Sequence, residues 1–245
     1  MCTAHDSTLS RRNFLGRAAT AGAAAVATGV VAPMVFAPMA HAAPSPDHRL
    51  FDTPSTPQDA LAALYAGNER FVKGEITAPN RNMTRLKEVA GGQKPFAAFL
   101  GCADSRVPIE IVFDQGFGDL FVTRIAGNVA DPAIIGSLEF GVEVLGASVL
   151  YVLGHSKCGA VSATIAGGEV PGQISTLYQH IRRAAKEANG DLTKAIERNV
   201  QIPAEILSEA SPVVARRIKA GQLTLAGGVY DLETGRVRPV AMPGK

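Results

Sequence analysis

The chain has 245 residues, of which 47% are hydrophobic and only 19% are charged, a balance typical of a folded protein with one or two domains. This composition excludes disorder for the bulk of the chain. The net charge is +2, and the residues after position 42 are formally neutral because the first 42 carry three arginines and one aspartate. A neutral chain lacks the basic surface that holds nucleic-acid phosphates, so we expect no nucleic-acid partner.

The first residues have the pattern of an export signal. Residues 10–16 read Ser-Arg-Arg-Asn-Phe-Leu-Gly, and residues 18–40 contain no charged side chain. This pattern resembles a twin-arginine signal, and Ala40-His41-Ala42 offers a small-x-small cleavage site. We therefore expect residues 1–42 to be a cleaved signal peptide and residues 43–56 to be a flexible start of a periplasmic or secreted chain.

A retained membrane anchor is the alternative for this segment, because the 23 uncharged residues from 18 to 40 are long enough to cross a bilayer. Pro33, Pro38 and the bias toward alanine and glycine argue against it. We expect no stable membrane association once the signal is removed.

The rest of the chain alternates helical and strand patterns. Thr56 before Pro57 is a typical helix cap, and apolar side chains at three- and four-residue spacing predict a helix over 57–73. Residues 95–101 form a short apolar run of the kind found in buried parallel strands. The other predicted elements are helices over 84–90, 132–145, 158–166, 175–188 and 191–219, the last interrupted by Pro203 and Pro212, and strands over 120–125, 148–154, 223–230 and 236–240.

This order of elements predicts an α/β fold with a mainly parallel central β-sheet flanked by helices. The turn sequence Asp231-Leu-Glu-Thr-Gly235 between the last two strands predicts a C-terminal β-hairpin. With no repeat and no linker in view, we expect residues 57–245 to form a single catalytic domain.

Metal-binding side chains follow two of the predicted strands. Cys102 comes directly after the first strand, and His155 and Cys158 come after the third. Parallel strands open on the same edge of a sheet, where ligands bind. Two thiolates and one imidazole are a ligand set that zinc accepts, with a fourth position left for water or a carboxylate. Taken singly, each cysteine would be better explained as a small buried hydrophobe at a strand end.

Asp104 and Arg106 lie on the turn that leaves the first of these strands. A carboxylate so near a zinc site can close it as a fourth ligand or accept a hydrogen bond from zinc-bound water. A bidentate pair with Arg106 would hold Asp104 ionised and turned away from the metal. Without Cys102 beside them, an ordinary helix-start aspartate and a solvated arginine would be the better interpretation.

The two motifs Cys102-x-Asp104-x-Arg106 and His155-x-x-Cys158-Gly159, about fifty residues apart, resemble the signature of the β-class carbonic anhydrases. The resemblance extends over residues 57–241 and includes Gly127-Asn128, Ser211-Pro212 and the run from Tyr230 to Gly235.

This resemblance implies a carbonic anhydrase, a zinc lyase that hydrates carbon dioxide reversibly to bicarbonate and a proton by a zinc-bound hydroxide. It implies one Zn²⁺ per chain, held by Cys102, His155 and Cys158, with Asp104 and Arg106 as the catalytic dyad. It also implies a homodimer or a dimer of dimers in which an N-terminal helical arm packs on a partner subunit.

The resemblance further implies a substrate pocket for carbon dioxide and bicarbonate. Gln93 would contact substrate across the dimer, Val107 and Phe121 would form apolar walls, and the Gly159 amide would contact the substrate oxygens. Phe140 stands where some relatives carry tyrosine. The regulated subtype, in which Asp104 moves onto zinc, has tryptophan at the position of Phe99, so we expect an open site here.

Other functions keep part of this pattern. A carbonyl sulfide or carbon disulfide hydrolase would use the same zinc site with different pocket walls. A purely structural zinc site would leave Asp104, Arg106 and Gln93 without a role. A thiol redox protein would need a Cys-x-x-Cys motif, which the sequence lacks.

Overall fold

The computed structural model describes residues 54–242, which form a five-stranded sheet with the strand order β2-β1-β3-β4-β5. The first four strands are parallel, and β5 pairs antiparallel with β4. The predicted α/β fold and C-terminal hairpin are therefore confirmed. The strands are β1 (Ala97–Gly101), β2 (Leu120–Arg124), β3 (Val149–His155), β4 (Thr224–Tyr230) and β5 (Val237–Pro239).

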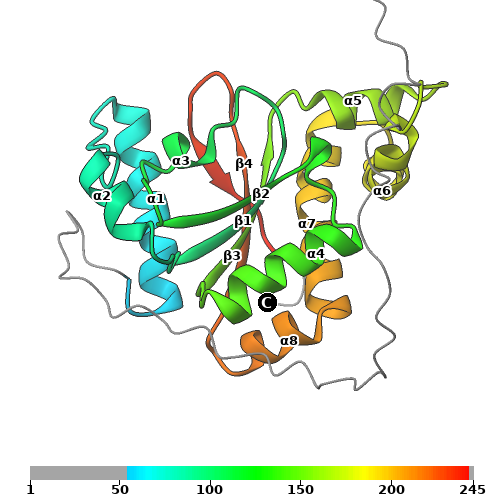
Figure 1. Cartoon of the computed structure of the whole chain (residues 1–245). Helices are drawn as coiled ribbons and strands as arrows, with labels where there is room; N and C mark the ends of the chain where they lie inside the picture. The colour runs from blue at the N-terminus through cyan, green and yellow to red at the C-terminus, as the bar shows by residue number, and fades with distance from the viewer. Residues whose placement is uncertain (1–53, 243–245) are drawn as a thin grey trace, which may run out of the picture. The chain divides into compact units, whose positions relative to one another are not determined.

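Helices cover both faces of this sheet (Figure 1). The helices α1 and α3 lie on one face, and α4 and α7 lie on the other. The helices are α1 (Pro57–Lys73), α2 (Met83–Val89), α3 (Ile109–Val112), α4 (Pro132–Glu139), α5 (Gly159–Ala166), α6 (Ile174–Glu187), α7 (Leu192–Ala210) and α8 (Pro212–Lys219). A 3₁₀ turn, η3 (Ala126–Asn128), follows β2, and a π-helical turn, η4 (Phe140–Val144), extends α4.

The central strands β1 and β3 are buried along their whole length, as expected for strands covered on both sides. Alternate side chains feed two apolar clusters. Leu100 and Val152 belong to the cluster under α7, whereas Phe99 and Tyr151 belong to the cluster under α1. Cys102 and Cys158 belong to the first of these clusters. Both cysteines therefore lie where the buried centre of the sheet reaches its carboxyl edge.

The helix α1 begins and packs as its sequence predicts. The Thr56 hydroxyl accepts a hydrogen bond from the Asp59 amide at 3.1 Å, Pro57 takes the first position, and Leu64 is fully buried against the sheet of its own chain. In contrast, α2 has no buried residue, and its Met83 is 64% exposed. That the N-terminal helical arm packs on a partner subunit stays a prediction.

The helix α7 departs from the sequence prediction, because it runs through Pro203 without a break. Proline removes one backbone donor and so leaves the carbonyl four residues earlier, that of Asn199, without its helical partner. The side-chain amide of Asn128 donates to this carbonyl at 2.8 Å and satisfies it. Only Pro212 separates two helices, at the first position of α8, where Ser211 is the cap.

The predicted signal peptide, its cleavage site, the alternative anchor and the start of the mature chain up to residue 53 lie outside the described residues. Between residues 54 and 242, no helix has the combination of length and apolar character that crossing a bilayer requires.

Candidate metal centre

The three predicted ligands come together at the carboxyl edge of the sheet. Gly101 of β1 pairs with Leu153 of β3, so the chain leaves both strands side by side. Cys102 follows β1, His155 ends β3, and Cys158 is the cap residue of α5. Their Sγ, imidazole nitrogen and Sγ atoms all lie within 4.8 Å of one another, and all three residues are buried.

The histidine has a nitrogen that needs a partner. His155 Nδ1 lies 3.0 Å from the Ser156 carbonyl oxygen. A carbonyl can only accept, so Nδ1 carries a proton and Nε2 is the ring nitrogen that can face a metal ion. This Nε2 is buried and has no hydrogen-bond partner in the protein. Because such orphaned atoms are rare and destabilising, the ring fits a metal ion that would take up the lone pair.

The Cys102 and Cys158 thiols interact so that one of the two is ionised more easily than the other. The hydrogen bond from the Cys158 thiol lowers the pKa of Cys102 to about 4, and the Gly127 amide lowers it further. The same sulfur–sulfur contact, together with burial, raises the pKa of Cys158. A divalent cation between the sulfurs would remove the repulsion that keeps the second proton on Cys158. The donor set therefore fits a thiophilic metal such as zinc.

Hydrogen bonds from the C-terminal hairpin hold the turn between His155 and Cys158 in place. The Ser156 amide donates to the Tyr230 carbonyl at 2.8 Å, and the Ser156 hydroxyl accepts from the Leu232 amide at 2.9 Å. Lys157 has a φ of 55°, which lets the chain reverse and bring Cys158 back toward His155. Gly159 is exposed, and a Cβ placed on it would meet no atom within 4 Å.

The predicted dyad is formed at the rim of this centre. Arg106 Nε and Nη2 donate to the two oxygens of Asp104 at 2.9 and 2.8 Å, and the Arg106 amide donates to Oδ1 at 2.9 Å. Asp104 Oδ2 lies 3.8 Å from His155 Nε2. These hydrogen bonds, that of the guanidinium above all, hold the pKa of Asp104 well below its usual range. Asp104 is therefore an ionised acceptor beside the metal ligands.

Two further residues, which the motifs did not single out as functional, support the centre. Arg124, at the end of β2, donates from Nε to the Cys102 carbonyl at 2.9 Å and from Nη2 to the Asp104 carbonyl at 2.6 Å. The Gly127 amide donates to Cys102 Sγ at 3.3 Å. Arg124 has no motif signal, whereas Gly127 belongs to a pair that the resemblance includes but that carries no role of its own.

The predicted pocket residues are spread over the fold. Gly159 lies at the centre. Val107 is fully buried in the cluster under α1, where its amide donates to the Asp104 carbonyl at 3.0 Å and closes the dyad turn. Gln93 is exposed and precedes β1, so it lies at the opposite end of that strand from Cys102.

Phe121 is also away from the metal ligands of its own chain. It is the second residue of β2 and pairs in register with Ala98, four residues before Cys102. Its ring packs on Phe140 with 6.2 Å between the ring centroids. Within one chain, the structure therefore joins the ligands, the dyad and Gly159, and it leaves Gln93 and Phe121 apart from them.

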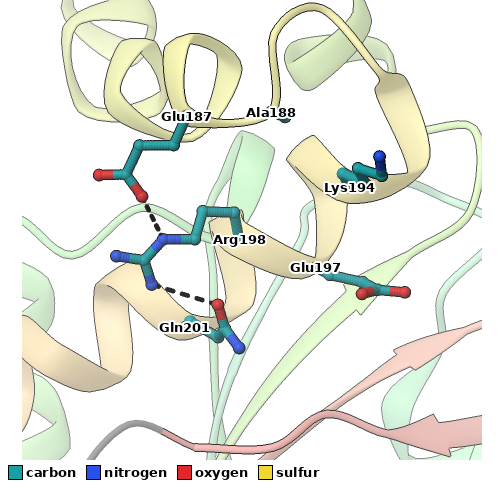
Figure 2. A pocket seen from close by; sticks show the side chains of 6 residues that line it. All are labelled: Glu187, Ala188, Lys194, Glu197, Arg198 and Gln201. Atoms are coloured by element: carbon teal, nitrogen blue, oxygen red, sulfur yellow. Dashed lines mark hydrogen bonds and ion pairs between the residues drawn. The ribbon is translucent and has the colours of Figure 1, made fainter.

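A separate hollow of about 230 Å³ lies between α6 and α7 (Figure 2). Its lining residues are Glu187, Ala188, Lys194, Glu197, Arg198 and Gln201. Figure 2 shows the Arg198 guanidinium directed at Glu187 and Gln201, and it also pairs with Glu205. The hollow contains no residue of the metal centre, and its arginine is engaged by neighbouring side chains.

Comparison with known proteins agrees with this geometry. The family model for carbonic anhydrase matches residues 97–237, more than half of the chain and the part that contains all three candidate ligands. Carbonic anhydrase 2 of Mycobacterium tuberculosis is 40% identical over 190 residues, which cover 74% of this chain and 92% of that protein. A carbonic anhydrase of Mycolicibacterium smegmatis is 38% identical over 191 residues, covering 75% and 93%.

Solved structures show the same fold. A β-carbonic anhydrase of Coccomyxa, determined in complex with acetazolamide, superposes with a TM-score of 0.57 at 27% identity and covers 74% of this chain and 86% of that one. A tetrameric β-carbonic anhydrase of Sordaria macrospora gives a TM-score of 0.61 at 21% identity and covers 75% and 98%. The family match, the identity to relatives covered almost end to end and the shared fold show that this chain belongs to the β-carbonic anhydrase family.

Proposed function

We propose that this chain catalyses the zinc-dependent, reversible hydration of carbon dioxide to bicarbonate and a proton. The observation that carries the proposal is the combination of three buried ligand atoms within 4.8 Å of one another and an ionised carboxylate 3.8 Å from one of them. A structural metal site would need the first feature but not the second. Membership of the β-carbonic anhydrase family supports the same reaction.

Cys102, His155 and Cys158 would hold the zinc ion. Bound zinc would supply a Lewis acid that lowers the pKa of a water ligand from about 15.7 to about 7. Three protein ligands leave a fourth tetrahedral position free, which is the arrangement of catalytic rather than structural zinc. His155 is oriented for this task by the Ser156 carbonyl, which fixes the ring tautomer.

Asp104 would orient the reacting water as a hydrogen-bond acceptor. Arg106 binds both of its oxygens and keeps it ionised, so Asp104 cannot donate a proton back. The pairing also occupies the carboxylate that would otherwise close the site as a fourth ligand, which supports an open site. Arg124 fixes the backbone on which Asp104 sits and so keeps the acceptor in place.

We infer that at least two copies of the chain form the working unit. Gln93 and Cys102 are separated by the whole of β1, whose five residues extend about 16 Å at about 3.3 Å per residue. Gln93 would therefore contact substrate held at the metal of a second copy. Exposed apolar side chains around α2 and η4 support such an association; they are Ile76, Met83, Leu86, Ile111, Phe117, Phe140 and Val144.

We also propose that the chain is exported by the twin-arginine route and acts in the periplasm or outside the cell. The support is the arginine pair at Arg11 and Arg12, the uncharged stretch after it and the cleavage site ending at Ala42. Replacing both arginines by lysine should retain the chain in the cytoplasm, which cell fractionation measures. N-terminal sequencing of exported protein should begin at Ala43.

Stopped-flow hydration of carbon dioxide across pH, with zinc quantified in the same sample, tests the main proposal. We expect one zinc per chain and a rate that rises through neutral pH. A Cys158→Ser variant should lose the metal, and full zinc content in that variant would contradict the ligand assignment. One zinc per chain without hydration would contradict the substrate, and assays with carbonyl sulfide and carbon disulfide would then test the alternative hydrolase.

A further inference from the structure

Two buried asparagines clamp the loop that follows β2. Asn199, on α7, donates from Nδ2 to the Gly127 carbonyl at 2.8 Å. Asn128 donates from its own Nδ2 to the Asn199 carbonyl at 2.8 Å. Both residues are 2% exposed. We call this reciprocal pair the Asn128–Asn199 bracket; it joins segments that are 71 residues apart in sequence.

The bracket exists because of the proline in α7. In an unbroken helix, the carbonyl of Asn199 would accept the amide of residue 203, but Pro203 has no amide hydrogen. The carbonyl is therefore available to Asn128, and the mid-helix proline becomes part of the support for the loop.

The clamped loop touches a metal ligand. The Gly127 amide donates to Cys102 Sγ at 3.3 Å, and this contact is buried. Gly127 and Asn128 have φ values of 72° and 42°, a left-handed conformation that turns the amide toward the sulfur. A Cβ at Gly127 would lie 2.6 Å from Ile181 Cδ1, so the loop is also wedged against α6.

An amide hydrogen bond withdraws charge from a thiolate and makes it a weaker donor. This matters here because two thiolate ligands give a metal more charge than imidazoles do and so weaken its action as a Lewis acid. Groups that hydrogen-bond to metal ligands tune both affinity and reactivity, and their loss lowers metal affinity or activity about 10- to 100-fold.

We propose that Asn128 and Asn199 are positioning residues of the metal centre. By holding the Gly127 amide on Cys102 Sγ, the bracket limits the charge that this sulfur passes to the metal and keeps the ligand in its binding geometry. The inference rests on the proposed metal site. Neither asparagine touches substrate or metal, so both act only through the Gly127 amide.

Cobalt(II) substitution tests this role without any measurement of activity. The sulfur-to-cobalt charge-transfer band reports the charge on the thiolates directly. In Asn199→Leu and Asn128→Gly, we expect the band to move to longer wavelength, because a sulfur without its amide donor gives up an electron more easily. We also expect the Kd for cobalt, measured in competition with a chelator, to be about tenfold higher, because the loop no longer holds Cys102 in its binding geometry and this loss outweighs the stronger donation.

Asn128→Gly removes the side chain while keeping a residue that accepts the φ of 42°, so its loop can still form. Asn68→Leu is the matched control. Asn68 is also 2% exposed, and its side chain bonds to the backbone of Val112, Gly235 and Val237, none of which is hydrogen-bonded to Cys102, His155 or Cys158. Its loss should lower stability and leave the cobalt band unchanged.

The outcomes separate the bracket from the metal site itself. Wild-type protein without a thiolate-to-cobalt band would overturn the metal proposal and the bracket with it. If folded Asn199→Leu and Asn128→Gly keep both the wild-type cobalt band and the wild-type cobalt affinity, the role of the bracket is overturned and the metal proposal stands. An equal shift of the band in Asn68→Leu would also overturn the role of the bracket alone. If Asn199→Leu does not fold, Asn128→Gly decides. A folded bracket variant that takes up no cobalt supports the proposal when Asn68→Leu still loads.

Discussion

Two arginine–aspartate pairs in this molecule have similar lengths and different surroundings. Asp114 is fully buried and accepts hydrogen bonds from Arg70 at 2.7 Å, from the Thr77 amide and hydroxyl at 3.0 Å, and from the Ala78 amide at 2.9 Å. Asp104 keeps 18% of its side chain exposed, and all the hydrogen bonds to its carboxylate come from Arg106, two residues away.

The two aspartates differ in how many further hydrogen bonds their carboxylates can accept. Donors on α1 and the segment after it saturate Asp114 and tie those segments to the end of α3, as a structural carboxylate should. The single partner of Asp104 lies on the same turn, which leaves acceptor capacity directed toward the metal ligands. Burial alone would raise the pKa of Asp114, but the bonds from Arg70 and Thr77 lower it below its usual value, and Arg106 lowers that of Asp104 further.

Removing the saturated carboxylate should have the largest effect on folding. We expect Asp114→Ala to lower the free energy of unfolding by about 3–5 kcal/mol, because it removes the buried carboxylate that pairs with Arg70 and leaves two backbone amides without their acceptor. Urea unfolding measures this loss. Zinc content and turnover per folded molecule should stay at the wild-type level, and a matching loss of zinc would show that Asp114 also supports the metal centre.

Asp104→Asn should have the opposite profile. The amide keeps the shape and one acceptor oxygen for Arg106 but loses the negative charge, so we expect hydration to fall about 100-fold. The unfolding midpoint and the zinc content should change little. Full activity in this variant would show that Asp104 takes no part in the mechanism. The contrast between the two aspartates would then have no bearing on function.

The Cys102–His155–Cys158 cluster and the Asp104–Arg106 pair that the structure contains could be predicted because each is signalled locally. Apolar runs end at Cys102 and His155, and a parallel sheet necessarily brings such ends to one edge. The bounds of the predicted strands and helices agree with the structure to within about two residues for the same reason, as the caps Thr56 and Asp131 show, whereas the short helix α3 was not predicted.

What could not be predicted depends on tertiary partners. Pro203 was predicted to interrupt the helix, because helix propensity carries no information that Asn128 hydrogen-bonds to the Asn199 carbonyl freed by the proline. Arg124 and Asn199 carry no motif, and their contacts arise only when β2 and α7 pack beside the site. The positions of Gln93 and Phe121 follow from strand length and register, which local sequence does not specify.

Acid should reduce the difference between wild type and an Asp114→Asn variant. The folded-state pKa of Asp114 lies below its unfolded value of about 3.9, so its charge stabilises the fold above that pH. This contribution is lost as pH falls below about 4 and approaches the folded-state pKa. Unfolding by urea at pH 7, 5, 4 and 3 should show the gap between the two proteins narrowing only in the acid range. A constant gap would mean that packing, not charge, is what the substitution removes.

The smallest effect should come from the pair nearest the metal in sequence. Lys157 lies between His155 and Cys158 and pairs with Glu233, but the two side chains are 63% and 70% exposed. Water screens such pairs, so Glu233→Gln should change the free energy of unfolding by less than about 1 kcal/mol and leave hydration unchanged. Stopped-flow rates beside those of Asp104→Asn provide the check. A tenfold loss of the hydration rate in Glu233→Gln would contradict the comparison. It would mean that an ion pair is functional because it lies close to the ligands, and not because its carboxylate can accept a further hydrogen bond.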